Sequence, residues 1–495
     1  ARHRERARRD AAVAAALASG GTEEQALRAL GVLPPAEMAA QARATLVSAQ
    51  SAVDQWLDLA ARGCLYPGAG FSKVAMGLRW LAILSAQFSP SSEQSSPLRV
   101  AGLGPPDFAK MLAAPGAGGK CRLAGGPVSA EEVVAVLVQV LVDDPFDINR
   151  ASAFALLTAW PLSPPSDEQA TRAWANRLLQ RALRLVASTR AGESESGALL
   201  IRWIFRKFVV AQHMRLDLIP NDISSEDQQQ LPCDAAFVGG LLELIRRAHA
   251  AAERNLLDAA QRHPLHGLLT AAQYVAEESA AAVGDDAAHG QHQGGWLEDL
   301  ARVAMGVCNV MLGVLTSASP EGNIPASFRE MEDKIDAIIQ SSEITAGGGD
   351  DDGCGDDDDD DDDDDLLVSG DVELDGPVGP RQQVILSYCW RAIKQVSGLL
   401  AAITMRRSAV SDQITMEIGQ LLHTLLTSIR HRGAFTAVHA AFTEVCGQMM
   451  RSPSAALNAA VGDWLDKCLD TSTICRVSVT RRSAGWPLCL LSVLT

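Results

Sequence analysis

The sequence has few aromatic residues. Phe, Trp and Tyr make up 5% of the 495 residues and only three are tyrosines, whereas alanine and leucine are abundant. Strands favour aromatic and β-branched residues, and helices favour alanine and leucine. The composition therefore argues against a sheet protein and predicts an all-α fold.

Catalytic motifs are also missing from the sequence. The stretch 114–121 contains Gly119-Lys120, but Ala114 and Cys121 stand where a phosphate-binding loop needs a glycine and a magnesium-binding Ser or Thr. The sequence shows no nucleophile–base pair and no glycine-rich strand–turn–helix unit for S-adenosylmethionine. We therefore expect no catalytic residues and no cofactor, and predict that the chain is not itself an enzyme.

The ten cysteines form no CxxC pair, and no Cys/His group has the sequence spacing of zinc ligands. Most lie in apolar helical contexts. This pattern is typical of reduced cysteines that fill a core, so we expect a cytoplasmic protein without a metal site.

The charge is unevenly distributed along the chain. The net charge is −17, but thirteen aspartates lie within 350–365, and without them the balance is about −4. From residue 381 to the end, twelve Lys/Arg stand against six Asp/Glu. The predicted organisation is a helical-repeat region at 1–345, a disordered Gly/Asp-rich acidic loop at 346–380, and a basic helical block at 381–495.

Amphipathic helical patterns follow one another between short polar breaks, which favours an α-solenoid of divergent HEAT or armadillo-like repeats. The spacing is irregular, and an ordinary large helical domain is the alternative. A Gly- and Pro-rich loop is expected at 89–127. Before the last block, the expected helices are 36–61, 71–88, 133–142, 147–161, 166–187, 196–218, 234–260 and 265–282.

The last block shows four apolar stripes at helical spacing, which predict two helical hairpins. The breaks between them lie at 406–411, 430–433 and 451–453, and each carries arginine. Arginines at successive turns would line one edge of the stack and form a phosphate-binding ridge.

One stretch, 303–320, lacks charged residues, but it contains Asn, Thr, Ser and Gly. It barely reaches the length of a membrane span and is not apolar enough for one. A buried helix is the preferred interpretation.

The most distinctive sequence is Thr480-Arg481-Arg482-Ser483-Ala484-Gly485-Trp486-Pro487. The arginines offer forked donors for phosphate or carboxylate, and Ser483 offers a helix cap or a hydroxyl. Gly485 allows a positive φ or a close backbone approach, and Pro487 would stiffen the exit from the turn. The alternative is a basic helix end followed by a Gly–Pro turn.

Three motifs in this order resemble the thyroid adenoma-associated (THADA) family. The first is Cys389-Trp390-Arg391 with Lys394, the second runs from Arg430 through Arg432 to Phe435, and the third is the Arg-Arg-Ser-Ala-Gly-x-Pro signature at 481–487. Trp486 departs from the family's usual Leu or Ile.

The resemblance implies a non-catalytic subunit. Fungal relatives support a FtsJ-like methyltransferase in 2′-O-methylation of nucleotide 32 in the tRNA anticodon loop. The expected partners are that enzyme and tRNA, and no membrane is expected. The residues expected to contact tRNA or the enzyme are Arg481, Arg482, Ser483, Gly485, Pro487, Arg430, Arg432 and Arg391.

Two other functions are consistent with the residues. A HEAT-like protein-interaction scaffold without an RNA role would make the arginines helix-end structure, and the pI near 5.0 favours it. A membrane-associated regulator would depend on the stretch 303–320 alone.

Overall fold

Helices are the regular secondary structure of the residues that the structure describes. No strand occurs among the described residues, which confirms the all-α class for them. The computed structural model describes residues 44, 48, 51–88, 130–160, 168–216, 218–219, 231–281, 290–315, 335–340, 380–406, 410–429, 432–469 and 485–494.

The chain divides into two compact units, Ala1–Pro164 and Pro165–Thr495. In the first unit, α8 packs against both α4 and α7, and a π-helical segment packs on α4. The elements of this unit are η1 (Leu59–Cys64), α4 (Phe71–Phe88), α7 (Ala130–Asp143) and α8 (Asp147–Ala159).

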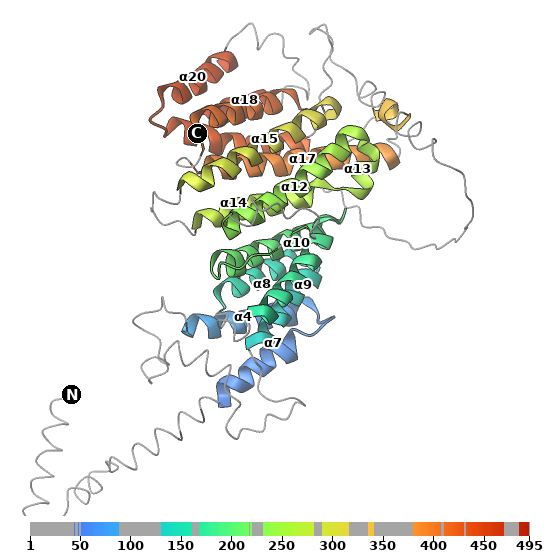
Figure 1. The fold of residues 1–495 in the computed structure, drawn as a ribbon, viewed down its shortest axis with the longest axis vertical. Coiled ribbons are helices and arrows are strands. Elements are labelled where there is room, and N and C mark those ends of the chain that lie inside the picture. Colours follow the sequence, from blue (N-terminus) through green and yellow to red (C-terminus); the bar gives the residue numbers. More distant parts are fainter. Residues whose placement is uncertain are drawn as a thin grey trace, which may run out of the picture. The chain divides into compact units, whose positions relative to one another are not determined.

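The second unit contains the helices of the basic C-terminal block together with helices from the preceding region (Figure 1). Its elements are α9 (Glu168–Val186), α10 (Ala191–Ile204), η2 (Phe205–Val210), α12 (Cys233–Arg254), α13 (Leu256–Arg262), α14 (Leu265–Ala281), α15 (Gly290–Leu315), α17 (Pro380–Thr404), α18 (Asp412–Ser428), α19 (Arg432–Met450), α20 (Ala455–Leu469) and α22 (Gly485–Leu494).

Helices of the second unit contact one another in two rows. In one row α12, α15, α18 and α20 follow each other, and in the other α10, α14, α17, α19 and α22 do. Contacts between α12 and α14, α15 and α17, α18 and α19, and α20 and α22 join the rows. Apart from α10, each of these helices therefore contacts a neighbour in its own row and a partner in the other row.

Most helices lie where the apolar spacing predicts them, including all four helices of the two C-terminal hairpins. Two predictions were wrong in detail. The helix expected at 196–218 begins earlier, at Ala191, and changes to π-helical geometry at Phe205. The helix expected at 234–260 is broken at Asn255, whose side chain accepts a hydrogen bond from the Asp258 N–H and begins a new helix.

A buried ion-pair network, here called the Glu278 cluster, joins α10, η2 and α14. Glu278 is 4% exposed, and its two carboxylate oxygens lie 2.7 Å from Arg202 Nε and 3.3 Å from Arg206 Nη1. Arg202 also pairs with Glu277 at 3.1 Å and lies over the Tyr274 ring. The buried carboxylate is thus neutralised by two guanidinium groups.

Two predicted loops lie outside the described residues, namely 89–127 and the acidic loop at 346–380 except for Pro380, which begins α17. The division at 345 and 380 stays a prediction, although α17 packs against α14 and α15 from the region before it. Residues 303–315 lie in α15, which packs between α12 and α17. None of the helices described is long and apolar enough to cross a membrane.

Candidate functional site in the C-terminal helices

The signature motif leads into a helix. Gly485 is the first residue of α22, and Pro487 lies in its first turn, where the missing N–H of proline leaves no hydrogen bond unmade. Gly485 and Pro487 are therefore helical, whereas the alternative interpretation placed them in a Gly–Pro turn. Arg481, Arg482 and Ser483 immediately precede this helix and lie outside the described residues.

Gly485 is buried against the backbone of α18. A Cβ atom at this position would lie 1.8 Å from the carbonyl oxygen of Leu426 and 2.9 Å from its carbonyl carbon. No side chain fits there unless one of the two helices moves. Close approach, rather than a positive φ, is the structural reason for glycine in the motif.

α22 is also held by its neighbours in both rows. It packs against α18, α19 and α20. Near its C-terminal end, the hydroxyl groups of Thr443 and Ser492 are hydrogen-bonded at 2.8 Å. The residues that follow the motif are thus fixed in the end of the helix stack.

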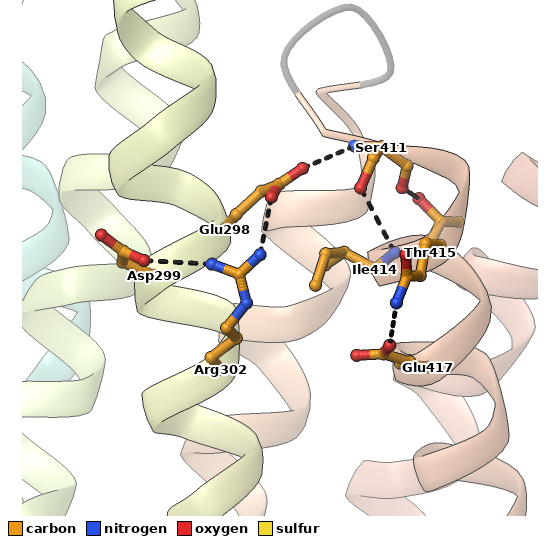
Figure 2. A network of polar contacts seen from close by, with 8 residues as sticks. Glu298, Asp299, Arg302, Ser411, Ile414, Thr415 and Glu417 are labelled. Carbon is orange, nitrogen blue, oxygen red and sulfur yellow. Dashed lines mark hydrogen bonds and ion pairs between the residues drawn. The ribbon is translucent and has the colours of Figure 1, made fainter.

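The opposite end of α18 is fixed to α15 by a polar network (Figure 2). Glu298 accepts hydrogen bonds from the Ser411 N–H at 3.0 Å and from Arg302 Nη2 at 2.9 Å. The hydroxyl of Ser411 accepts from the Ile414 N–H at 3.5 Å, which caps α18. The hydrogen bonds from Ser411 lower the pKa of Glu298.

Arg391 makes contacts inside the second unit. Its Nη1 donates to the Thr189 carbonyl at 2.8 Å, and its guanidinium lies 6.0 Å from the Trp390 ring centroid. Burial lowers its pKa, and its charge acts on His266 of α14. Arg391 therefore joins α17 to the α9–α10 turn, whereas Gly485 lies against α18.

The other arginine-bearing turns are described in part. Arg430 lies outside the described residues, and Arg432 is the first residue of α19, with its side chain outside them. At the first turn, Arg406 Nη2 donates to the Glu277 carbonyl at 3.1 Å. This arginine therefore has a structural role between α17 and α14, and a continuous basic ridge stays a prediction.

A group that the sequence reasoning missed lies beside α22. His423 of α18, Cys468 of α20 and Cys489 of α22, here called the thiol–imidazole cluster, are all buried. Each offers one donor atom, and these atoms lie within 4.8 Å of one another. The two Sγ atoms share a hydrogen bond at 3.4 Å.

The neighbouring cysteines affect one another's pKa values. The pKa of Cys468 is lowered, first because the Cys489 thiol hydrogen-bonds to its thiolate and then because His423 lies beside it. The same hydrogen bond raises the pKa of Cys489. Burial, followed by the charge of Cys468, raises the pKa of Cys446 on α19 to about 12. Cys468 is therefore the most acidic of these three thiols.

Aromatic packing fixes the imidazole of His423. Its ring is stacked on Trp464, with centroids 5.6 Å apart and an interplanar angle of 14°, and Phe442 contacts both rings. Its Nε2 is buried and has no hydrogen-bond partner among the described residues. Leaving a buried polar atom without a partner costs roughly 1–3 kcal/mol, and a ligand bound at this nitrogen would remove that cost.

A weak sequence signal for the cluster exists. His423, Cys446, Cys468 and Cys489 follow one another at intervals of 23, 22 and 21 residues. That interval corresponds to one helix and its turn, so each of four successive helices contributes one residue. Zinc-ligand spacing was sought in the sequence only at the short intervals of familiar zinc motifs, so these longer intervals were missed.

Comparison with known proteins finds relatives that are named as regulators of a tRNA methyltransferase. A tRNA (32-2′-O)-methyltransferase regulator, trm732 of Schizosaccharomyces pombe, is 24% identical over 441 residues, which cover 87% of this chain and 24% of that protein. The regulators named THADA of Homo sapiens and Gallus gallus are 26% and 34% identical. They align over 64% and 23% of this chain and over 18% and 6% of their own lengths.

The chain thus spans about a quarter or less of the length of these relatives. No solved structure matches it significantly. The family described as THADA/TRM732, DUF2428, matches residues 296–495, which include α17 to α22 and all three sequence motifs. Over these residues, the chain is similar to the THADA/TRM732 family.

Proposed function

We propose that this protein is a non-catalytic regulatory subunit of a tRNA methyltransferase, supporting 2′-O-ribose methylation of nucleotide 32. The observation that carries the proposal is the family match over residues 296–495, together with relatives named as regulators of that methyltransferase. In this proposal a FtsJ-like partner in the cytoplasm holds S-adenosylmethionine and performs the transfer. The chain holds enzyme and tRNA in position, and positioning alone contributes greatly to a reaction rate.

The two rows of helices support a HEAT-like solenoid as the scaffold for this role. In such a stack each repeat contacts its neighbours only, and the repeats together present a long surface to a partner. The order of contacts from α10 to α22 and from α12 to α20 follows this arrangement. A large tRNA and an enzyme are partners of a size that such a surface suits.

We assign tRNA phosphate or a partner carboxylate to Arg481 and Arg482, with Ser483 as an additional donor. These residues directly precede α22, whose first residue is locked against α18 by the Gly485 contact. Gly485 and Pro487 thus act by fixing the start of the helix. Arg430 and Arg432 would extend the same basic surface, and Arg391 would serve through its guanidinium donors that do not face Thr189.

The test is the double substitution Arg481→Ala/Arg482→Ala in a strain that lacks its own regulator. We expect methylation of nucleotide 32 to be abolished while the protein accumulates and melts normally. The matched control is Arg246→Ala/Arg247→Ala, because these neighbouring arginines are exposed on α12 and Arg247 makes only a surface ion pair with Glu243 among the interactions described. Normal methylation with the first double variant would refute the assignment of the motif.

Measuring tRNA binding distinguishes the proposed function from a protein-interaction scaffold without an RNA role. Phosphate contacts make affinity fall steeply with salt. We expect a tRNA gel shift that weakens as salt rises and that weakens further in the Arg481/Arg482 double variant. A chain that binds the methyltransferase but shows no salt-dependent shift would favour the protein-interaction scaffold, consistent with its pI near 5.0.

A further inference from the structure

The thiol–imidazole cluster has the geometry of a small metal site. In tetrahedral zinc coordination with Zn–S bonds of about 2.3 Å, the two sulfurs lie roughly 3.7 Å apart. Cys468 Sγ and Cys489 Sγ are 3.4 Å apart, and the His423 donor lies within 4.8 Å of both. To hold one ion, the two sulfurs would separate by a few tenths of an ångström and the imidazole nitrogen would approach them by up to roughly 1.3 Å.

The donors also have matching chemistry. Two thiols and an imidazole form a soft set that selects a thiophilic d¹⁰ cation over magnesium or calcium, which prefer oxygen. The Nε2 atom of His423 is buried and has no partner in the described part of the chain, and stacking on Trp464 holds the ring in place. Cys446 is buried on the neighbouring helix α19, but it is not among the donors that lie within 4.8 Å of one another.

We propose that His423, Cys468 and Cys489 bind a zinc ion that joins α18, α20 and α22. The fourth position of the ion is open to a water molecule. Binding releases the thiol protons to solvent and involves no change of oxidation state. The site does not depend on the proposed function, because it follows from the packing of these helices alone.

The ion would stabilise the end of the helix stack. Cys489 lies four residues after Gly485, so a bond from its sulfur to the ion fixes α22 directly behind the signature motif. A structural zinc site contributes to folding because the unfolded chain lacks a preformed site. Removing the ion should therefore loosen α22 first, since it is the shortest of the three helices.

The experiment measures metal binding by the full chain, purified under reducing conditions. We expect about one zinc per chain by elemental analysis. Titration of the stripped protein with Co²⁺ should give a thiolate charge-transfer absorption, which zinc then abolishes. Zinc should also raise the melting temperature of the stripped chain.

Two variants test whether the zinc content and the Co²⁺ absorption come from the thiol–imidazole cluster. His423→Phe keeps an aromatic ring against Trp464 and removes the donor nitrogen, and Cys468→Ala removes a sulfur. Each should weaken zinc binding by more than the roughly 10–100-fold typical of outer-shell changes. The matched control is Cys308→Ala, which removes another fully buried thiol, on α15, and should leave zinc binding unchanged.

Three results would overturn the proposal. The first is a wild-type chain that binds neither Zn²⁺ nor Co²⁺. The second is equal binding by wild type, His423→Phe and Cys468→Ala. The third is a Cys468–Cys489 disulfide, found by mass spectrometry of protein alkylated directly in cell lysates. Because the readouts are metal content and absorption, they are independent of any result on tRNA methylation.

Discussion

Two clusters in the second unit bury polar side chains, and they differ in how completely those side chains are paired. In the Glu278 cluster, the buried carboxylate meets two guanidinium groups. In the thiol–imidazole cluster, two thiols share a hydrogen bond and an imidazole nitrogen has no partner among the described residues. In the Glu278 cluster, protein groups pair both carboxylate oxygens. In the thiol–imidazole cluster, the unpaired nitrogen could still bind a ligand.

The largest effect is expected from breaking the complete cluster. Arg202→Met would leave Glu278 buried with Arg206 alone, and removing one partner of a buried ion pair costs about 3–5 kcal/mol. Urea unfolding should show this loss. Arg172→Met, which breaks an exposed pair with Glu168, should cost less than about 1 kcal/mol. Equal losses in the two variants would show that the Glu278 cluster is not stabilising.

A second prediction concerns the helix that carries Cys489. In Gly485→Ala the new Cβ would collide with the Leu426 carbonyl, and we expect a loss of about 3 kcal/mol, at the upper end of overpacking effects. Thermal unfolding and proteolysis of α22 would measure it. Gly462→Ala in α20 is the control, because a Cβ there meets no atom within 4 Å and alanine favours helix. A stable Gly485→Ala variant would contradict the close approach.

His266 can be compared with His423, because it is also a buried imidazole with an unpaired Nε2. Its charged neighbour is Arg391, whereas His423 lies beside thiols. Burial, followed by the charge of Arg391, lowers its pKa from 6.5 to about 4. The unfolded state therefore takes up the proton first, and stability that is complete above pH 6.5 should be lost as the pH falls toward 4. The loss is on the order of 3 kcal/mol.

This pH dependence is measured by urea unfolding between pH 7 and pH 4. His266→Phe should flatten the dependence in that window, because the buried titrating group is gone. His263→Gln is the matched control, since His263 is exposed three residues earlier. The interpretation fails if both variants retain the wild-type dependence.

The smallest effect is expected at the other end of α18. Ser411→Ala removes the hydroxyl that accepts from Ile414, and the loss of such a cap typically costs about 1 kcal/mol. The hydrogen bond from the Ser411 N–H to Glu298 stays, so α18 should remain attached to α15. Thermal unfolding would measure the change. A loss as large as that of Gly485→Ala would mean that the cap, rather than the α22 contact, is the critical end of α18.

Local patterns predicted much of this fold. The helices α4, α7, α8, α9 and α14 lie within a few residues of their expected bounds, because their apolar spacing is regular. α22 was missed, since its run of apolar residues has no periodic polar face and the Gly-Trp-Pro sequence resembles a turn. The break at Asn255 was missed because a single capping side chain decided it.

The sequence by itself determined the helical class, the positions of most helices and the family motifs, because these depend on residue types within one or two turns of the chain. The tertiary structure alone decided why Gly485 is glycine, since the Leu426 carbonyl that excludes a Cβ lies 59 residues earlier. It also decided that His423, Cys468 and Cys489 meet. Contacts between helices depend on how whole helices pack, and no short segment of sequence specifies that.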